Sequence, residues 1–285
     1  KETGLPEHAF QSLLIPGNRV EEVIAHPHVA AVTLTGSTPA GRSVAALAGK
    51  YLKKTVLELG GSDPYLILAD ADMSHAIKTC ATSRLGNCGQ SCVSAKRLIV
   101  VPEIKEAFEQ GMLDAFSAQK TGNPLDIATT VGPMARADLR DELHDQVERT
   151  IAAGARCLTG GKNPGGKIAF YPPTILTDVR KGMPAYTEEL FGPVAVIIPA
   201  KDEADAIAIA SDTVFGLGGA VFSKDLARAE KIAREHIESG TAVVNMMVRS
   251  DPRLPFGGIK ESGYGRELSA FGIREFVNIK TIIVA

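Results

Sequence analysis

Short apolar runs alternate with helical repeats along most of the chain. Runs rich in Val, Ile and Leu predict buried strands, and apolar residues at helical spacing predict helices that pack on them. The predicted strands are Val29–Thr35, Thr55–Leu59, Tyr65–Leu68, Arg97–Val101, Pro193–Pro199, Gly219–Phe222 and Ala242–Asn245. The predicted helices are Ala40–Leu52, Asp70–Leu85, Glu103–Gln119, Asp138–Ala153, Asp202–Ser211 and Asp225–Glu238. Strands of this kind, separated by helices, indicate an α/β fold with mainly parallel sheets.

The last eight residues have a different pattern. Asn278–Ala285 is rich in β-branched residues, and no helix follows it. An exposed terminal strand tends to pair with another chain. We therefore expect a homodimer or homotetramer that forms through this C-terminal strand.

Composition narrows the classes of function. The 285 residues are 45% hydrophobic, which is enough for a sizeable core and more than one domain. The formal net charge is −2 and no basic stripe is present, so nucleic acid is not an expected partner. No apolar run approaches the roughly 20 residues that span a bilayer, so no membrane partner is expected. The N-terminus lacks a signal-peptide core and does not begin with Met, so Lys1 need not be the natural start.

The number of cysteines indicates the cellular compartment of the protein. The chain has four: Cys80, Cys88, Cys92 and Cys157. A chain of this length does not need disulfides to fold, so reduced thiols in the cytoplasm are expected. Cys88 and Cys92 are four residues apart, but no further Cys or His pair at zinc spacing accompanies them. The sequence therefore predicts no metal site.

An acidic residue ends one predicted strand. Glu58 lies in the run Leu57–Gly61, and two glycines follow it. The carboxyl ends of parallel strands face the ligand crevice, where partial burial raises a carboxyl pKa towards neutrality and favours a general base. Taken alone, the motif fits a surface glutamate near a turn better, because acidic strand ends are common.

A cysteine follows a glycine turn in the segment Gly89–Arg97. Cys92 is expected near the start of a helix, where the helix dipole stabilises a thiolate. A thiolate is a strong nucleophile towards a carbonyl carbon. The alternative is a small buried hydrophobic residue, which most free cysteines are.

Three further segments carry weaker signals. Glu189 and Phe191 precede a strand, and a carboxylate can bind ribose hydroxyls while an aromatic ring packs on a flat ligand. Gly36 and Ser37 join a strand to a helix, where backbone amides can hold a cofactor phosphate or ring. The glycine-rich segment 255–267 requires tight turns. Each also fits an ordinary loop or helix end.

Together and in this order, the motifs resemble the aldehyde dehydrogenase superfamily. The likeness covers nearly the whole chain and includes Gly36-Ser37, LELGG with Glu58, GQSC with Cys92, EELFGPV with Glu189 and Phe191, and PFGGIKESGYGRE. Three stretches, LGGSDP, GPMAR and YPPT, are most similar to bacterial succinate-semialdehyde dehydrogenases that use NAD or NADP.

The resemblance implies a role for each matching residue. Cys92 would be the nucleophile and Glu58 the general base. The cofactor-binding residues would be Gly36, Ser37, Leu59, Glu189 and Phe191. The residues lining the aldehyde tunnel would be Ser91, Val93, Ser250, Arg253 and Phe256. Ser250 and Arg253 fit solvated loop residues equally well, because most arginines lie at the surface.

The implied reaction proceeds through a thioester. The Cys92 thiolate adds to the aldehyde, the adduct gives a hydride to NAD or NADP, and water activated by Glu58 hydrolyses the thioester. A relative that transfers the acyl group to coenzyme A is the alternative enzyme, but a water-activating Glu58 would work against it. A further alternative is a truncated or non-catalytic chain that keeps the fold.

The resemblance also implies the domain plan. Residues 1–60 would be the last part of a Rossmann-type cofactor domain, residues 61–260 an α/β catalytic domain, and residues 261–285 a return helix and oligomerisation strand. Members of the family extend further at the N-terminus. There they carry an oxyanion-hole Asn and the loop that distinguishes NADP from NAD, so both cofactors stay open.

Overall fold

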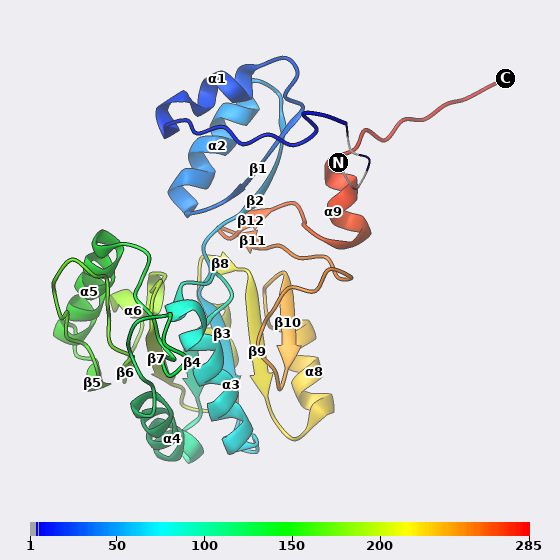
Figure 1. The fold of residues 1–285 in the computed structure, drawn as a ribbon. Helices are drawn as coiled ribbons and strands as arrows, with labels where there is room; N and C mark the ends of the chain where they lie inside the picture. The colour runs from blue at the N-terminus through cyan, green and yellow to red at the C-terminus, as the bar shows by residue number, and fades with distance from the viewer. Residues whose placement is uncertain (1–3, 5) are drawn as a thin grey trace.

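Two separate sheets divide the molecule into an upper and a lower part (Figure 1). The computed structural model describes residue 4 and residues 6–285. The upper sheet has the order β1-β2-β12 and the lower sheet the order β10-β9-β3-β4-β7-β6-β5. The chain crosses from the upper to the lower sheet between β2 and β3. The two ends of this crossing, Glu58 and Asp63, are separated by only four residues.

The upper sheet combines strands from both ends of the chain. Strands β1 (Ala31–Thr35) and β2 (Lys54–Glu58) are parallel, and β12 (Gly263–Tyr264) is antiparallel to β2. The helical segments of the upper part are η1 (Gly17–Arg19), α1 (Val20–Ala25), α2 (Thr38–Lys50) and α9 (Ser269–Glu275). A two-stranded ribbon of β8 (Phe215–Gly216) and β11 (Ile259–Lys260) lies near the boundary of the two parts (Figure 1). The predicted domain limits at residues 60 and 260 remain predictions.

The lower sheet is parallel except at one edge. Its strands are β3 (Asp63–Ile67), β4 (Ala95–Val100), β5 (Arg156–Thr159), β6 (Thr174–Thr177), β7 (Val194–Pro199), β9 (Gly218–Phe222) and β10 (Thr241–Val244). Only β5 pairs antiparallel, with β6. Strands β3, β4 and β9 are buried along their whole length, which explains the apolar runs Tyr65–Ile67, Leu98–Val100 and Ala220–Phe222 within them. The predicted α/β fold with a mainly parallel sheet is confirmed.

Helices cover this sheet and complete the core. They are α3 (Met73–Leu85), η2 (Gly86–Gly89), η3 (Pro102–Ile104), α4 (Lys105–Ser117), α5 (Ala137–Ala152), α6 (Pro184–Thr187), α7 (Glu203–Ser211) and α8 (Leu226–Glu235). Asp72, Asp202 and Asp225 cap α3, α7 and α8 by accepting a backbone N–H of the first turn. Among the described residues, no helix is long and apolar enough to cross a membrane.

The predicted strand at Asn278–Ala285 does not form in this structure. The segment is extended and runs away from the upper part after α9 (Figure 1). Ile279, Ile282 and Ile283 have exposed fractions of 80%, 77% and 89%. A strand requires a neighbour to accept its backbone hydrogen bonds, and the described part of the chain offers none to this segment.

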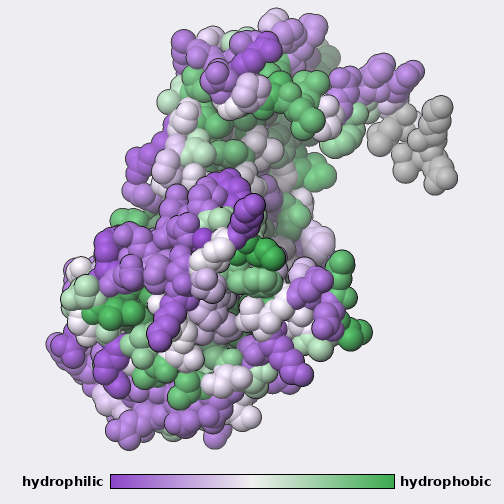
Figure 2. Space-filling view, turned by 60° about the vertical axis from the view of Figure 1, so that its left-hand side comes forward, coloured by the Kyte–Doolittle hydropathy of each residue, from purple (hydrophilic) through white to green (hydrophobic). Residues whose placement is uncertain are grey.

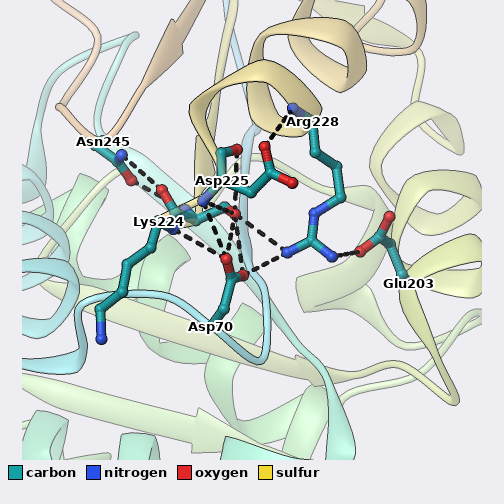
Figure 3. Close-up of polar contacts among 7 residues, drawn as sticks. Asp70, Glu203, Lys224, Asp225, Arg228 and Asn245 are labelled. Atoms are coloured by element: carbon teal, nitrogen blue, oxygen red, sulfur yellow. Dashed lines mark hydrogen bonds and ion pairs between the residues drawn. The ribbon is translucent and has the colours of Figure 1, made fainter.

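A polar cluster joins β3, β9 and α8 at the far end of the lower sheet. Asp70, just after β3, accepts hydrogen bonds from the Ser223 hydroxyl and from the Lys224 and Asp225 amides. It also pairs with Arg228, as Figure 3 shows. Desolvation opposes ionisation of Asp70, but the Ser223 and Asp225 bonds and the Arg228 charge lower its pKa. The cluster follows the carboxyl ends of these strands and fixes the turn that begins α8.

Candidate active site

The candidate residues come together where the upper sheet meets the lower one. Glu58 is the last residue of β2, and Cys92 lies in the turn that precedes β4. The crossing segment follows Glu58 directly and packs against the Cys92 backbone. If Gly61 carried a Cβ atom, that atom would lie only 2.7 Å from the carbonyl oxygen of Cys92. From the C-terminal part, a Cβ on Gly257 would lie 2.7 Å from Oε1 of Glu58. Only glycine permits such approaches, so these two positions allow three distant segments to converge.

The Glu58 side chain is buried without a partner. Its exposed fraction is 4%, and neither carboxylate oxygen accepts a hydrogen bond from any described residue. Burial raises the pKa of Glu58 to about 7, the Glu267 carboxylate adds to the rise, and Arg266 opposes it. A carboxyl group with this pKa holds and releases a proton near neutral pH, which suits a general base.

Cys92 does not begin a helix, so the predicted helix-dipole stabilisation of its thiolate is wrong. The preceding residues Asn87, Cys88 and Gly89 have φ angles of 51°, 54° and 69°, which turn the chain out of helical geometry. Cys92 then occupies a turn and is half-buried. Burial raises the pKa of the Cys92 thiol, Lys96 opposes this, and the acidic side chains nearby, Glu58 among them, add to it. The thiol therefore needs a base to ionise near neutral pH.

Glu189 contacts the crossing segment at Gly61. Its Oε1 accepts the Gly61 amide at 3.0 Å and pairs with Lys96 Nζ at 3.0 Å. No described residue donates a hydrogen bond to its Oε2, and its side chain is 19% exposed. The Phe191 ring is 40% exposed, with Lys96 Nζ 5.8 Å from its centroid. A free carboxylate oxygen beside an accessible aromatic ring fits a ribose hydroxyl next to a flat heterocycle.

The predicted cofactor residues Gly36, Ser37 and Leu59 lie beside Glu58. The Gly36 amide donates to the Glu58 carbonyl at 3.0 Å, because β1 and β2 pair in register. Ser37 caps α2 by accepting the Ala40 amide, and Leu59 is buried beneath this helix start. The structure therefore brings the N-terminus of α2 and the candidate base to the same edge of the upper sheet.

The predicted tunnel residues fall into two groups. Ser91 and Val93 flank Cys92 and are half-buried, and half-buried Phe256 precedes the glycine that touches Glu58. Ser250 and Arg253 are exposed instead. Arg253 pairs with Asp251 at 2.6 Å and is 86% exposed, so its guanidinium lies at the surface.

Charged side chains buried beneath the site were not predicted. Arg84, Lys96, Arg97 and Asp63 each expose 1% or less, and Asp63 has its pKa raised to about 7 by burial. The available signal was the pair Lys96-Arg97 at the start of the predicted apolar strand. Buried charges must be paired or hydrogen-bonded, so a charge in such a strand indicates a specific interaction. Among the described residues, no group of three His, Cys, Asp or Glu side chains could hold a metal ion.

Comparisons with known proteins agree on one family. The model of the aldehyde dehydrogenase family matches residues 1–282. A succinate-semialdehyde dehydrogenase [NADP(+)] of Mycolicibacterium paratuberculosis is 50% identical over 98% of this chain and 59% of its own length. A probable enzyme of the same name from Synechocystis sp. is 48% identical over 99% of this chain and 62% of its own length.

Solved structures give the same result. Succinic semialdehyde dehydrogenase from Streptococcus pyogenes, in complex with NADP+, superposes with a TM-score of 0.96 and 41% identity, covering 99% of this chain and 62% of that one. Lactaldehyde dehydrogenase from Escherichia coli gives 0.92 and 34%, covering 96% of this chain and 58% of that one. This chain thus spans about 60% of the length of the curated relatives described above.

Proposed function

The chain belongs to the aldehyde dehydrogenase family, and we propose that it oxidises succinate semialdehyde to succinate with NADP+ or NAD+. The observation that carries the proposal is the buried Glu58 carboxylate, which has no hydrogen-bond partner among the described residues. It lies close enough to the half-buried Cys92 thiol for its charge to raise the pKa of that thiol. The names of the relatives support the substrate and the cofactor.

In the proposed reaction Glu58 and Cys92 carry out the chemistry, and the other site residues bind the cofactor. Glu58 takes the thiol proton, and the Cys92 sulfur adds to the aldehyde carbon to give a tetrahedral adduct. A nicotinamide cofactor, when bound, supplies a hydride acceptor. Glu189 and Phe191 would hold its ribose and ring, and Gly36, Ser37 and Leu59 would line the other side. Loss of hydride leaves an acyl group on Cys92 as a thioester.

Glu58 then completes the turnover. Glu58 first releases the thiol proton to solvent, and its carboxylate then removes a proton from water. The hydroxide attacks the thioester carbonyl, the C–S bond breaks, and the Cys92 sulfur takes the proton back from Glu58 as the acid leaves. This role argues against the coenzyme A-dependent alternative, because a base that activates water promotes hydrolysis of the thioester in competition with capture by a thiol.

The substrate proposal is tested by comparing aldehydes of similar length. Succinate semialdehyde should exceed butanal in kcat/KM, because a cationic side chain at the tunnel entrance stabilises its carboxylate. We propose Arg253, with Ser250, as the entrance group. Arg253→Met should lower kcat/KM for succinate semialdehyde by roughly 10-fold or more, as expected for a lost charged hydrogen bond. It should leave the value for butanal unchanged. Equal turnover of the two aldehydes by the unmodified chain would contradict the substrate assignment.

We also propose a homodimer or homotetramer that forms through Asn278–Ala285. Hydrophobic residues reach the surface of the upper part in Figure 2, and four of the last seven residues are exposed large hydrophobics. Ile283→Asp should lower the self-association constant by at least about tenfold, since a charge in a strand interface must be desolvated. Sedimentation equilibrium measures this, with Ile127→Asp, at an exposed residue outside this segment, as the control for added negative charge. An unchanged constant would contradict pairing through this segment.

The cytoplasm is the proposed compartment. All four cysteines are unpaired in the structure, and reduced thiols are usual there.

A further inference from the structure

The ammonium of Lys96 is almost completely buried, yet all of its donors are used. Lys96 is 1% exposed. Its Nζ donates to the carbonyl oxygens of Ser91 and Cys92, both at 2.9 Å, and pairs with Glu189 Oε1 at 3.0 Å. An ammonium has three N–H bonds, so these three acceptors satisfy it completely. Burial lowers the pKa of Lys96, and the Glu189 carboxylate opposes that change.

The two carbonyls belong to successive peptide groups around the nucleophile. In a trans peptide the C=O and N–H bonds point in opposite directions, and no cis peptide bond is present in the described chain. Drawing the Ser91 and Cys92 carbonyls towards Lys96 therefore turns the amides of Cys92 and Val93 away from it. Neither amide donates a hydrogen bond to another residue in the part of the chain that the structure describes.

The loop that carries Cys92 is buried on the side of Lys96 and less buried on its other side. Residues 91–93 are half-buried, whereas Lys96 lies beneath them in a strand that is buried along its length. Amides turned away from Lys96 thus point from the buried strand towards the less buried side of the loop that carries Cys92. Two unused N–H donors at such a place can stabilise an oxygen that gains negative charge during addition to the sulfur.

We propose that Lys96 is a positioning residue that holds the Cys92 and Val93 amides ready for the oxyanion formed when a carbonyl compound adds to Cys92. The inference rests on the proposed function only in taking Cys92 as the nucleophile. Lys96 also binds Glu189 Oε1 and leaves Oε2 without a donor. The same ammonium therefore holds the loop of Cys92 and the Glu189 carboxylate at a fixed distance from each other. A tetrahedral ammonium serves three acceptors in three directions, which a planar guanidinium does not.

The test compares two reactions of the same thiolate, neither of which needs a nicotinamide. Iodoacetamide alkylates sulfur by displacing iodide, and no oxyanion forms. p-Nitrophenyl acetate is attacked at its carbonyl carbon, and the oxyanion intermediate collapses to a Cys92 thioester and p-nitrophenolate. The ratio of the acylation to the alkylation rate constant cancels any change in thiolate fraction, so it reports stabilisation of the oxyanion alone.

Lys96→Met should lower this ratio by roughly 10²-fold or more, the usual effect of losing one oxyanion donor. All chains carry Cys157→Ala, because Cys157 is exposed and would react with both reagents. Cys80 and Cys88 are buried, and burial raises the pKa of Cys88 to about 11, so they compete little.

Lys224→Met is the matched control. Lys224 is exposed and follows the carboxyl end of β9, in the polar cluster of Figure 3, whereas Cys92 precedes the amino end of the parallel β4. This control should leave the ratio unchanged. If Lys96→Met does not fold, the Lys96→Met/Glu189→Gln variant removes both charges of the buried pair and leaves neither uncompensated. The same fall in the ratio is expected for it.

A ratio that stays within about threefold of the parent value in a folded Lys96 variant would overturn the proposal, even if both rates fell. Such a result would mean that Lys96 only supports the fold of the loop. A parent chain in which neither reagent modifies Cys92 would overturn the proposed function as well, because Cys92 would then not be a nucleophile.

Discussion

Cys92→Ala should lower aldehyde oxidation by at least about 10⁴-fold, which is the scale of effect seen when a catalytic nucleophile is removed. Without the sulfur no thioester forms, and no other cysteine can replace it. Cys80 and Cys88 are buried and have raised pKa values, and Cys157 lies on β5 at the far edge of the lower sheet. The measurement is the initial rate of NADPH formation at saturating succinate semialdehyde, with thermal melting to confirm that the variant folds.

Cys157→Ala is the control, because it removes an exposed thiol outside the site and should keep full activity. Cys92→Ser tests the chemistry more sharply. A hydroxyl has nearly the same shape but ionises far less readily than a thiol, so this variant should be as inactive as Cys92→Ala. Residual turnover above one hundredth of the parent rate in the alanine variant would exclude Cys92 as the nucleophile.

Glu58→Gln should lower kcat by roughly 10²–10⁴-fold, the usual contribution of a general base. The amide cannot accept the proton of the thiol or of water. In the parent chain only ionised Glu58 is active, so kcat should rise with pH through about 7, the pKa that burial gives this group. The Gln variant should lose this step. The readout is the kcat–pH profile from about pH 5.5 to about pH 8.5, a range that brackets the pKa of Glu58. Glu103→Gln, on the exposed side of η3, is the control.

The same substitution should increase thermal stability, by an amount that depends on pH. A carboxyl group whose pKa is higher in the folded chain than in the unfolded chain favours folding while it is protonated. That contribution is lost as pH rises from the unfolded value of about 4.5 through about 7. At pH 8 the parent carries a buried charge without a partner, and the Gln variant does not. Its Tm should therefore exceed the parent Tm by a few degrees at pH 8, and by less at pH 5. An equal difference at both values would contradict the burial mechanism.

The sequence predicted the strongly apolar elements well and the sheet edge poorly. Strands β3, β4, β7 and β9 are buried on both faces, so their apolar runs were sufficient evidence. Strand β5 was missed because Arg156 and Cys157 are exposed and its pattern does not differ from a loop. The short strand β12 was missed because its pairing with β2 depends on residues far away in sequence, which periodicity does not report.

In the site, motif order gave Glu58, Cys92 and Glu189 as candidates, and the structure places all three around one crossing segment. The error was the backbone around Cys92. A run of positive φ angles at Asn87, Cys88 and Gly89 has no simple sequence rule, because Gly and Asn tolerate such angles but Cys88 does not favour them. Lys96 was also missed, because a lysine at the edge of an apolar run gives no indication of which carbonyl groups it will meet.

The pairing of β2 with β12 has a consequence for the order of folding. Ser262 donates to the Gly60 carbonyl across a sequence separation of 202 residues, and Gly263 pairs with Glu58 itself. Contacts this distant in sequence form late, because closing a long loop costs entropy before any contact compensates for it. A chain whose lower sheet has already formed would still hold Glu58 in water, as an ordinary acid. The capacity for catalysis would then appear in the last kinetic phase of refolding, after the helices and the central strands have reached their native signals.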